Sequence, residues 1–368
     1  MRQHSAWAGA LALAITASAC VETFGGVIMI STRKNICVDW GTDNVDEKGP
    51  GMTSPGDVAM STLLGNHGYS CRLILDALLG TEPTTYLQPQ NPDLKIDLVI
   101  WSGSSSSADV PTPPPDVPLM MGEHVTLGNR TDRLGSIFMY NGTDSNDPNE
   151  GTGATKYMKV IAPDHPIMAG IPLDSEGRVK MFREAYPEEE LHVPTGGKKN
   201  FEYRWCTQNV AAAAPGTTVL GVLDGTTDRA CLAVVDKGGI LANDQAATAR
   251  MVHMFTNEQG SGGARRVFLA VTELGQLIFV RAAKWAMGEE LQPVKSFRIL
   301  DVKPAGAQNL TLSWEGSAKH NYRIQASTVF SDWQTVVDDI VGGDGVVSRT
   351  LDLAAAPKTL FLRVGATP

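Results

Sequence analysis

The residues best suited to acid–base chemistry are Glu123 and His124, which follow the apolar run 118–121 after one glycine. A carboxylate beside an imidazole can transfer protons near neutral pH or bind a metal ion. The run is typical of a buried strand, so the pair is expected at the carboxyl end of a strand, and we predict Glu123 and His124 as catalytic residues. A solvated strand end is the alternative, because one carboxylate and one imidazole fall short of a site. No metal ion and no cofactor are predicted.

Three further charged residues, Arg183, Glu202 and Arg204, are predicted to bind substrate. Residues 201–205 alternate with period two, which places Glu202 and Arg204 on one face of a strand and three aromatic rings on the other. Both charged groups can bind sugar hydroxyls or a carboxylate. The alternative is a structural strand whose aromatic face packs in the core and whose other face carries Glu202 and Arg204 as a charge pair.

Strand and helix patterns alternate along residues 25–288, which predicts an α/β domain. The run 54–57 (Ser-Pro-Gly-Asp) combines an N-cap, a proline at the first helical position and an acid, so a helix should begin there and reach Asn66. A closing helix is expected over 275–287, ended by Gly288. Continuous apolar runs favour a parallel sheet covered on both faces, with strands expected at 26–30, 71–75, 96–101, 118–121, 136–140 and 266–271.

Residues 102–118 are rich in serine and proline and follow the predicted strand 96–101. Ligands bind at the carboxyl ends of strands in open α/β sheets, so this stretch is a candidate lid, with a tolerated surface loop as the alternative. The sequence has no GxSxG, GxxxxGK[ST] or HExxH motif, and so lacks these signals for a nucleophile elbow, a phosphate loop or a zinc helix.

Short strands separated by turn residues predict a small all-β sandwich over 297–368, after a linker at 289–296. Its aromatic residues are candidates for a sugar-stacking face, although strand positions favour core packing. These residues are Trp314, Tyr322, Trp333 and Phe361.

Residues 1–20 are typical of an export signal, with an early Arg2, an apolar stretch and a small-residue cleavage region. The run 17–20 (Ala-Ser-Ala-Cys) resembles a bacterial lipobox, so Cys20 is a candidate lipidation site that would anchor the protein to the outer surface of a membrane. Simple secretion is the alternative. We therefore expect an exported protein that is periplasmic, a cell-surface lipoprotein or secreted.

Four cysteines remain after Cys20, an even number that suits disulfides in an oxidising compartment. The pairing that closes the shorter loops joins Cys37 to Cys71 and Cys206 to Cys231. Free buried thiols are the alternative.

The chain carries 31 Lys and Arg against 40 Asp and Glu, a net charge of −9. Nucleic acid is not an expected partner, because neutralising phosphates requires a basic surface. The sequence does not predict an oligomeric state.

Three segments resemble a known family. Residues 164–172 (DHPIMAGIP) look like the HPI-x-x-G segment of trehalose-utilisation (ThuA-like) proteins, which belong to the class I glutamine amidotransferase-like superfamily. Residues 262–268 resemble the family's G-x-GRVF strand, and 282–288 its closing helix with WA-x-G. The resemblance covers about 26–288, and the tail is similar to fibronectin-type-III-like modules.

The resemblance implies a flavodoxin-like sheet and carbohydrate metabolism. Glutamine hydrolysis is not expected, because 102–105 (Ser-Gly-Ser-Ser) occupies the region where the superfamily has its elbow cysteine. We expect an exported protein that acts on or binds carbohydrate at the cell envelope. The alternative is a non-catalytic surface binding or assembly module built on the same fold.

Overall fold

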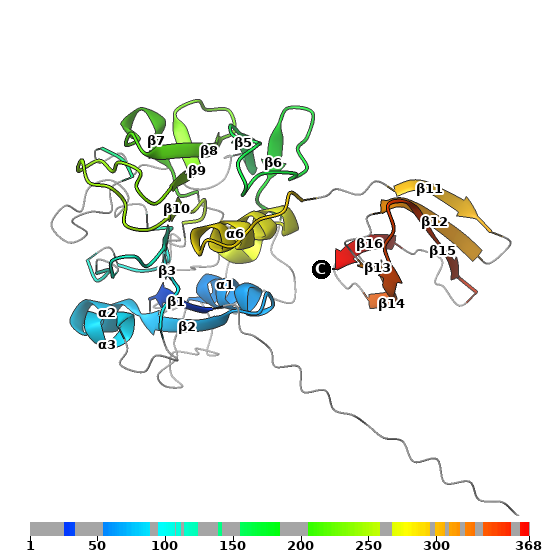
Figure 1. Cartoon of the computed structure of the whole chain (residues 1–368), viewed down its shortest axis with the longest axis horizontal. Coiled ribbons are helices and arrows are strands. Elements are labelled where there is room, and N and C mark those ends of the chain that lie inside the picture. The colour runs from blue at the N-terminus through cyan, green and yellow to red at the C-terminus, as the bar shows by residue number, and fades with distance from the viewer. Residues whose placement is uncertain are drawn as a thin grey trace, which may run out of the picture.

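The computed structural model describes residues 26–33, 54–88, 95–106, 108–111, 114–123, 139–141, 155–184, 205–257, 267–294, 299–305, 309–316, 321–327, 334–354 and 361–367. They form an α/β domain with a largely parallel sheet core and, in the tail, two small antiparallel sheets (Figure 1). The predicted fold class is confirmed.

The strands at the centre of the α/β domain run parallel in the order β2-β1-β3-β4-β10, which is the flavodoxin-like order. These strands are β2 (Ser70–Leu75), β1 (Val27–Thr32), β3 (Leu98–Trp101), β4 (Leu119–Met121) and β10 (Met251–His253). Beyond β10 the sheet continues through antiparallel pairings. The strands of this extension are β9 (Arg229–Val235), β8 (Thr217–Leu223), β5 (Tyr157–Val160) and β6 (Arg178–Lys180), with β7 (Gln208–Asn209) paired to β9.

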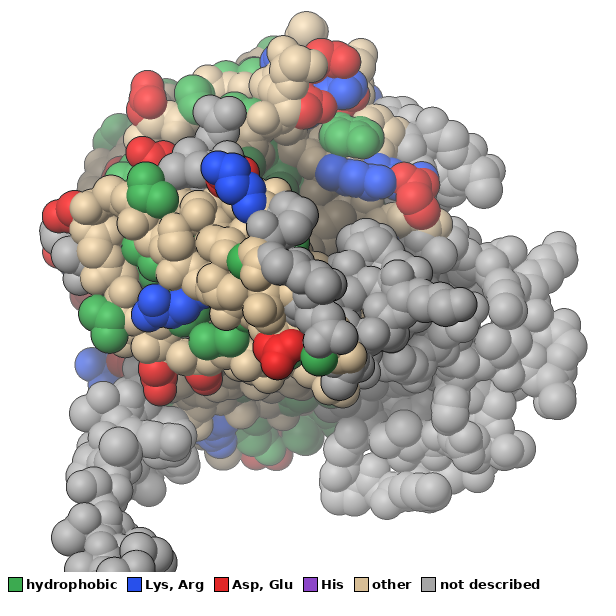
Figure 2. Space-filling model, turned by 90° about the vertical axis from the view of Figure 1, so that its right-hand side faces the viewer, with side chains coloured by type: hydrophobic (Ala, Val, Ile, Leu, Met, Phe, Trp, Pro, Cys, Tyr) green, Lys and Arg blue, Asp and Glu red, His purple; other side chains and the backbone are tan. Residues whose placement is uncertain are grey.

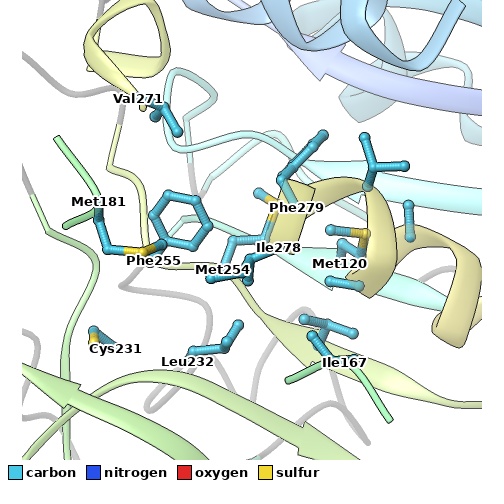
Figure 3. Close-up of a cluster of buried hydrophobic side chains, with 14 of the residues drawn as sticks. Met120, Ile167, Met181, Cys231, Leu232, Met254, Phe255, Val271, Ile278 and Phe279 are labelled. Atoms are coloured by element: carbon cyan, nitrogen blue, oxygen red, sulfur yellow. The ribbon is translucent and has the colours of Figure 1, made fainter. Parts of the chain in front are cut away.

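Apolar side chains cover both faces of the sheet. One face packs on helices α1 (Pro55–Gly65) and α6 (Glu273–Ala286), and Figure 3 shows Met120, Met254 and Ile278 in this core. The other face packs on α2 (Asp76–Thr81) and α3 (Pro83–Leu87), through Leu79 and Leu87. Successive strand residues point to opposite faces, so burial on both faces explains the continuous apolar runs.

Helix α1 begins where the sequence predicts. Ser54 is the N-cap residue, Pro55 follows it, and Asp57 lies in the first turn. The Ser54 side chain makes no capping hydrogen bond, and its backbone N–H donates to Thr32 Oγ1 at 3.1 Å. This bond ties the start of the helix to the carboxyl end of β1.

The predicted strand at 266–271 is wrong. Residues Val267–Ala270 form a short 3-10 helix, η7, and the Phe268 ring packs edge-on against Phe279 of α6 at 4.8 Å. Thr272 then caps α6 by accepting a hydrogen bond from Gly275 N at 3.1 Å. A short apolar run is equally compatible with a buried strand or a buried helical turn, and packing against α6 decides the outcome here.

The predicted strand at 136–140 lies mostly outside the described residues. Tyr140 makes an isolated antiparallel bridge with Ala213. Within the stretches that the structure describes, no helix is both long and apolar enough to span a membrane.

The tail contains two antiparallel three-stranded sheets with one common core. Trp314 and Tyr322 are buried in it with their rings 5.7 Å apart, so core packing is confirmed for both. Trp333 and the Phe361 side chain lie outside the described residues. One sheet comprises β11 (Ile299–Pro304), β12 (Asn309–Gly316) and β15 (Gly345–Asp352), and the other β14 (Gln334–Val341), β13 (Asn321–Ser327) and β16 (Phe361–Thr367).

Candidate functional site

The strand order reverses between β1 and β3. From β1 the chain passes to β2 on one side, and only later to β3 on the other side of β1. Such a switch leaves a crevice outside the carboxyl ends of the strands, where ligands bind in open α/β sheets. Ser31 and Thr32 end β1 and Ser102 directly follows β3, so hydroxyl side chains occupy this position.

A buried hydrogen-bond network joins these hydroxyls to the first turn of α1. The Asp57 carboxylate accepts hydrogen bonds from the hydroxyls of Ser102 and Ser104, the latter at 2.6 Å. Ser31 Oγ accepts from Ser102 N at 3.0 Å and lies 2.7 Å from Ser105 Oγ. All five residues are buried, so residues 102–105 are part of the folded edge of the sheet and not a tolerated surface loop.

Gly122 shows how closely the neighbouring strand ends converge. A Cβ at this position would lie 2.8 Å from Met254 Cε, 3.0 Å from the Thr256 carbonyl oxygen and 3.3 Å from Gly103 N. A larger residue would therefore require Met254 and the neighbouring backbone to shift where β4 ends between β3 and β10. The next residue, Glu123, is fully buried, which places a carboxylate at this edge.

Two polar atoms at these strand ends have no hydrogen-bond partner among the residues that the structure describes. They are Trp101 Nε1, at the end of β3, and Thr256 Oγ1, shortly after β10, and both are buried. Leaving such a group unsatisfied costs about 1–3 kcal/mol, so these atoms suit contact with a bound water or ligand. We call Asp57, Trp101, Ser102, Glu123 and Thr256 the carboxyl-edge site.

Ser102 lacks the geometry of an activated nucleophile. An elbow holds its nucleophile on a strained strand-to-helix turn, whereas Ser102 is not among the non-glycine residues with positive φ. Its hydroxyl donates to Asp57, and no histidine in the described part of the chain contacts it. The arrangement therefore suits hydrogen bonding to a ligand better than acyl transfer.

A neutral histidine is buried at the end of β10. His253 Nε2 donates to the Cys206 carbonyl oxygen at 3.1 Å, and Nδ1 accepts from Tyr140 Oη at 3.0 Å. Burial lowers the pKa of His253 to about 3, although the bond to Cys206 opposes the shift. Both ring nitrogens are occupied, so His253 stabilises the core in its uncharged form.

This histidine should make stability depend on pH. The folded pKa of about 3 lies below the ordinary value of 6.5, so the unfolded chain binds more protons between these values. The free energy of unfolding should therefore fall as the pH drops through this window, by up to about 1.4 kcal/mol per pH unit from this group. Urea titrations of wild type and His253→Gln across pH 4–7 measure the difference in slope.

Tyr140→Phe is the control for that titration. It removes the hydroxyl that bonds to Nδ1 but keeps the buried imidazole, so the protein should lose about 1 kcal/mol and retain the wild-type slope. Identical slopes in wild type and His253→Gln would contradict the assignment.

Of the predicted site residues, the structure describes Glu123 and Arg183. Glu123 is buried just after β4, and Arg183 lines a cavity beside α1 whose lining does not include Glu123. His124, Glu202 and Arg204 lie outside the described residues.

The predicted disulfide between Cys206 and Cys231 is absent. Both thiols are free and buried, and they belong to different core clusters of the α/β domain. Cys71 is also free, and burial raises its pKa to about 11. Its predicted partner Cys37 lies outside the described residues, as does the lipidation candidate Cys20.

Arg281 of α6 holds the segment 164–172 in place. Its Nε donates to the Ile167 carbonyl oxygen at 2.7 Å, and Nη2 donates to Pro166 O and Ala169 O. Its Nη1 donates to Gln292 O at 2.8 Å, in the chain that follows α6. Arg281 is itself buried, so one guanidinium satisfies carbonyl groups from two segments.

The same segments make two further contacts. The His165 ring lies 5.4 Å from the Trp285 ring, and Val294 N donates to Ala169 O at 2.9 Å. Gly170 has φ +78°, and a Cβ there would collide with the Val294 backbone. We call these contacts and those of Arg281 the α6 clamp. The two segments that carry much of the family resemblance, 164–172 and 282–288, thus have a structural role here.

Sequence reasoning misses Asp57 and Thr256 as site residues. Sheet topology could have identified Asp57. In a parallel α/β sheet the helix after β1 begins at the carboxyl edge, so the first turn of that helix faces the residues that follow β3. No sequence pattern marks Thr256, because only the fold shows that its hydroxyl has no hydrogen-bond partner among the described residues.

These features define an α/β protein with a flavodoxin-like parallel core, a polar site at the carboxyl edge of that core, and two small antiparallel sheets. No protein-family model matches the chain, and no curated protein matches it.

Proposed function

We propose that this chain is an exported, ThuA-like carbohydrate-binding protein, and that the carboxyl-edge site holds the sugar. One observation carries the proposal. Hydroxyl, carboxylate and indole N–H groups lie at the carboxyl ends of the parallel strands, and two of them, on Trp101 and Thr256, have no hydrogen-bond partner among the described residues. A sugar presents hydroxyls that both donate and accept, and so can satisfy such groups.

The location and the sugar class rest on the sequence. The export signal and the lipobox-like run ending at Cys20 support a position at the cell envelope, anchored through lipid or released. The HPI-x-x-G and WA-x-G resemblances support carbohydrate as the ligand class. The tail is proposed as a fibronectin-type-III-like module, in keeping with its two antiparallel sheets.

Nucleic acid is not part of the proposal. The net charge is −9, and on the face in Figure 2 the basic side chains drawn in colour are scattered among acidic and uncharged ones. A surface assembly module is the second candidate. The bond from the Ser102 hydroxyl to Asp57 favours it over an enzyme with a serine nucleophile.

A glycan array followed by a turnover screen of every bound sugar tests the proposal. We expect binding without turnover, and Glu123→Gln should weaken the binding about tenfold or more, because a carboxylate is a stronger hydrogen-bond acceptor than an amide. Glu82→Gln, at an exposed helix end, is the matched control. No bound glycan would favour the assembly module. Turnover that Glu123→Gln and His124→Ala abolish would establish an enzyme with this acid–base pair.

A further inference from the structure

An open cavity lies between α1 and the segment leading into α6, and Glu123 and the serines of the carboxyl edge do not line it. Its volume is about 410 Å³, within the range of small-molecule sites. One wall is apolar and includes Ala59, Leu63 and Leu269, and Asn66 and Gln276 add amide groups.

Arg183 is the only charged residue that lines this cavity in the described structure. Its backbone N–H donates to Ala270 O at 2.7 Å, and the neighbouring Phe182 bridges to Val271, so the chain is fixed at this point. Among the described residues its guanidinium has no hydrogen bond and no ion pair. The neighbouring Glu184 does not compensate it, because that carboxylate pairs with Lys156 and Lys180.

These features indicate a ligand that combines a carboxylate with an apolar body. A planar guanidinium offers paired N–H donors that match a carboxylate. The apolar wall suits a hydrocarbon chain or ring, and a volume of about 410 Å³ accommodates a small molecule. We propose that this cavity binds a carboxylate-bearing small molecule whose apolar body packs against Leu63 and Leu269 while its carboxylate meets Arg183.

The test uses the full exported chain and two probes, 4-phenylbutyrate and its uncharged analogue 4-phenyl-1-butanol. Titration calorimetry should give a Kd of about 1 mM or tighter for the acid and about tenfold weaker binding for the alcohol. Arg183→Gln should weaken the acid about tenfold and leave the alcohol unchanged. The variant should fold, because the Arg183 side chain makes no hydrogen bond or ion pair in the described structure, and its melting temperature checks this.

Leu63→Asn is the second variant and should weaken both probes, because it makes the apolar wall polar. Arg349→Gln, at an exposed tail residue, is the matched control and should leave both affinities unchanged. Equal affinities for acid and alcohol, no binding of either probe, or an Arg183→Gln variant that binds the acid as wild type does would each overturn the proposal. Glycan binding is measured separately, so its failure leaves this result intact.

Discussion

Replacing Arg281 with methionine should lower the free energy of unfolding by about 3 to 5 kcal/mol. Arg281 is buried, and its guanidinium is a hydrogen-bond donor to the carbonyl oxygens of Pro166, Ile167, Ala169 and Gln292. Methionine keeps much of the apolar stem but donates no hydrogen bond, so these carbonyls lose this donor. Chemical denaturation at pH 7 measures the loss.

Two further variants distinguish the loss of the α6-clamp hydrogen bonds from a general effect of removing an arginine. Arg281→Lys should recover only part of the loss, because an ammonium group lacks the planar fork that reaches carbonyls from two segments. Arg349→Met, at an exposed tail residue, should stay within about 0.5 kcal/mol of wild type. An Arg281→Met protein within 1 kcal/mol of wild type would refute the α6 clamp as a stabilising element.

Asp57→Ala should cost about 2 to 4 kcal/mol. The carboxylate is buried and accepts hydrogen bonds from the hydroxyls of Ser102 and Ser104, and alanine would leave both hydroxyls without this acceptor. Asp57→Asn should fall between wild type and alanine, because one amide oxygen still accepts while the amide nitrogen cannot. Thermal or urea unfolding gives the three values.

Asp228→Ala, at an exposed residue, is the control for this series and should change stability by no more than about 0.5 kcal/mol. If Asp57→Ala unfolds at the same urea concentration as wild type, the hydrogen bonds between Asp57 and the serines do not stabilise the fold at the carboxyl-edge site.

Four of the five parallel strands, β2, β1, β3 and β4, were predictable from largely apolar runs, whereas β10 was not among the expected strands. The start of α1 was predictable from local residues alone, because proline is tolerated only in the first turn of a helix and an acidic residue is favoured there. The segment 266–271 was not, because a four-residue apolar turn and a short strand have the same sequence pattern, and contact with α6 decides between them.

Most of the candidate site was out of reach of sequence reasoning. Glu123 was predicted as a site residue because it comes just after a strand, with one glycine between them. Asp57 and Ser102 are 45 residues apart and meet only through the order of β1 and β3. Arg281 lies in the predicted closing helix, but the carbonyl groups of Pro166, Ile167 and Ala169 that it binds come from a segment more than 100 residues earlier. Such long-range partners leave no local pattern.

The central claim is that the carboxyl-edge site holds the sugar, and Thr256→Val tests it most directly. The claim predicts that this one substitution leaves stability unchanged or raises it, while it weakens glycan binding. The Thr256 hydroxyl is buried and has no hydrogen-bond partner in the described part of the chain, so removing it should leave the free protein as stable as wild type or about 1 kcal/mol more stable. Affinity for the glycan identified on the array should fall about tenfold, because the sugar loses a hydrogen bond.

Thr85→Val, at an exposed residue of α3, is the matched control and should change neither quantity. Unchanged or increased stability together with weakened glycan binding in Thr256→Val is the result the account predicts. Wild-type affinity in Thr256→Val would contradict it, because the sugar would then bind elsewhere than at the carboxyl-edge site.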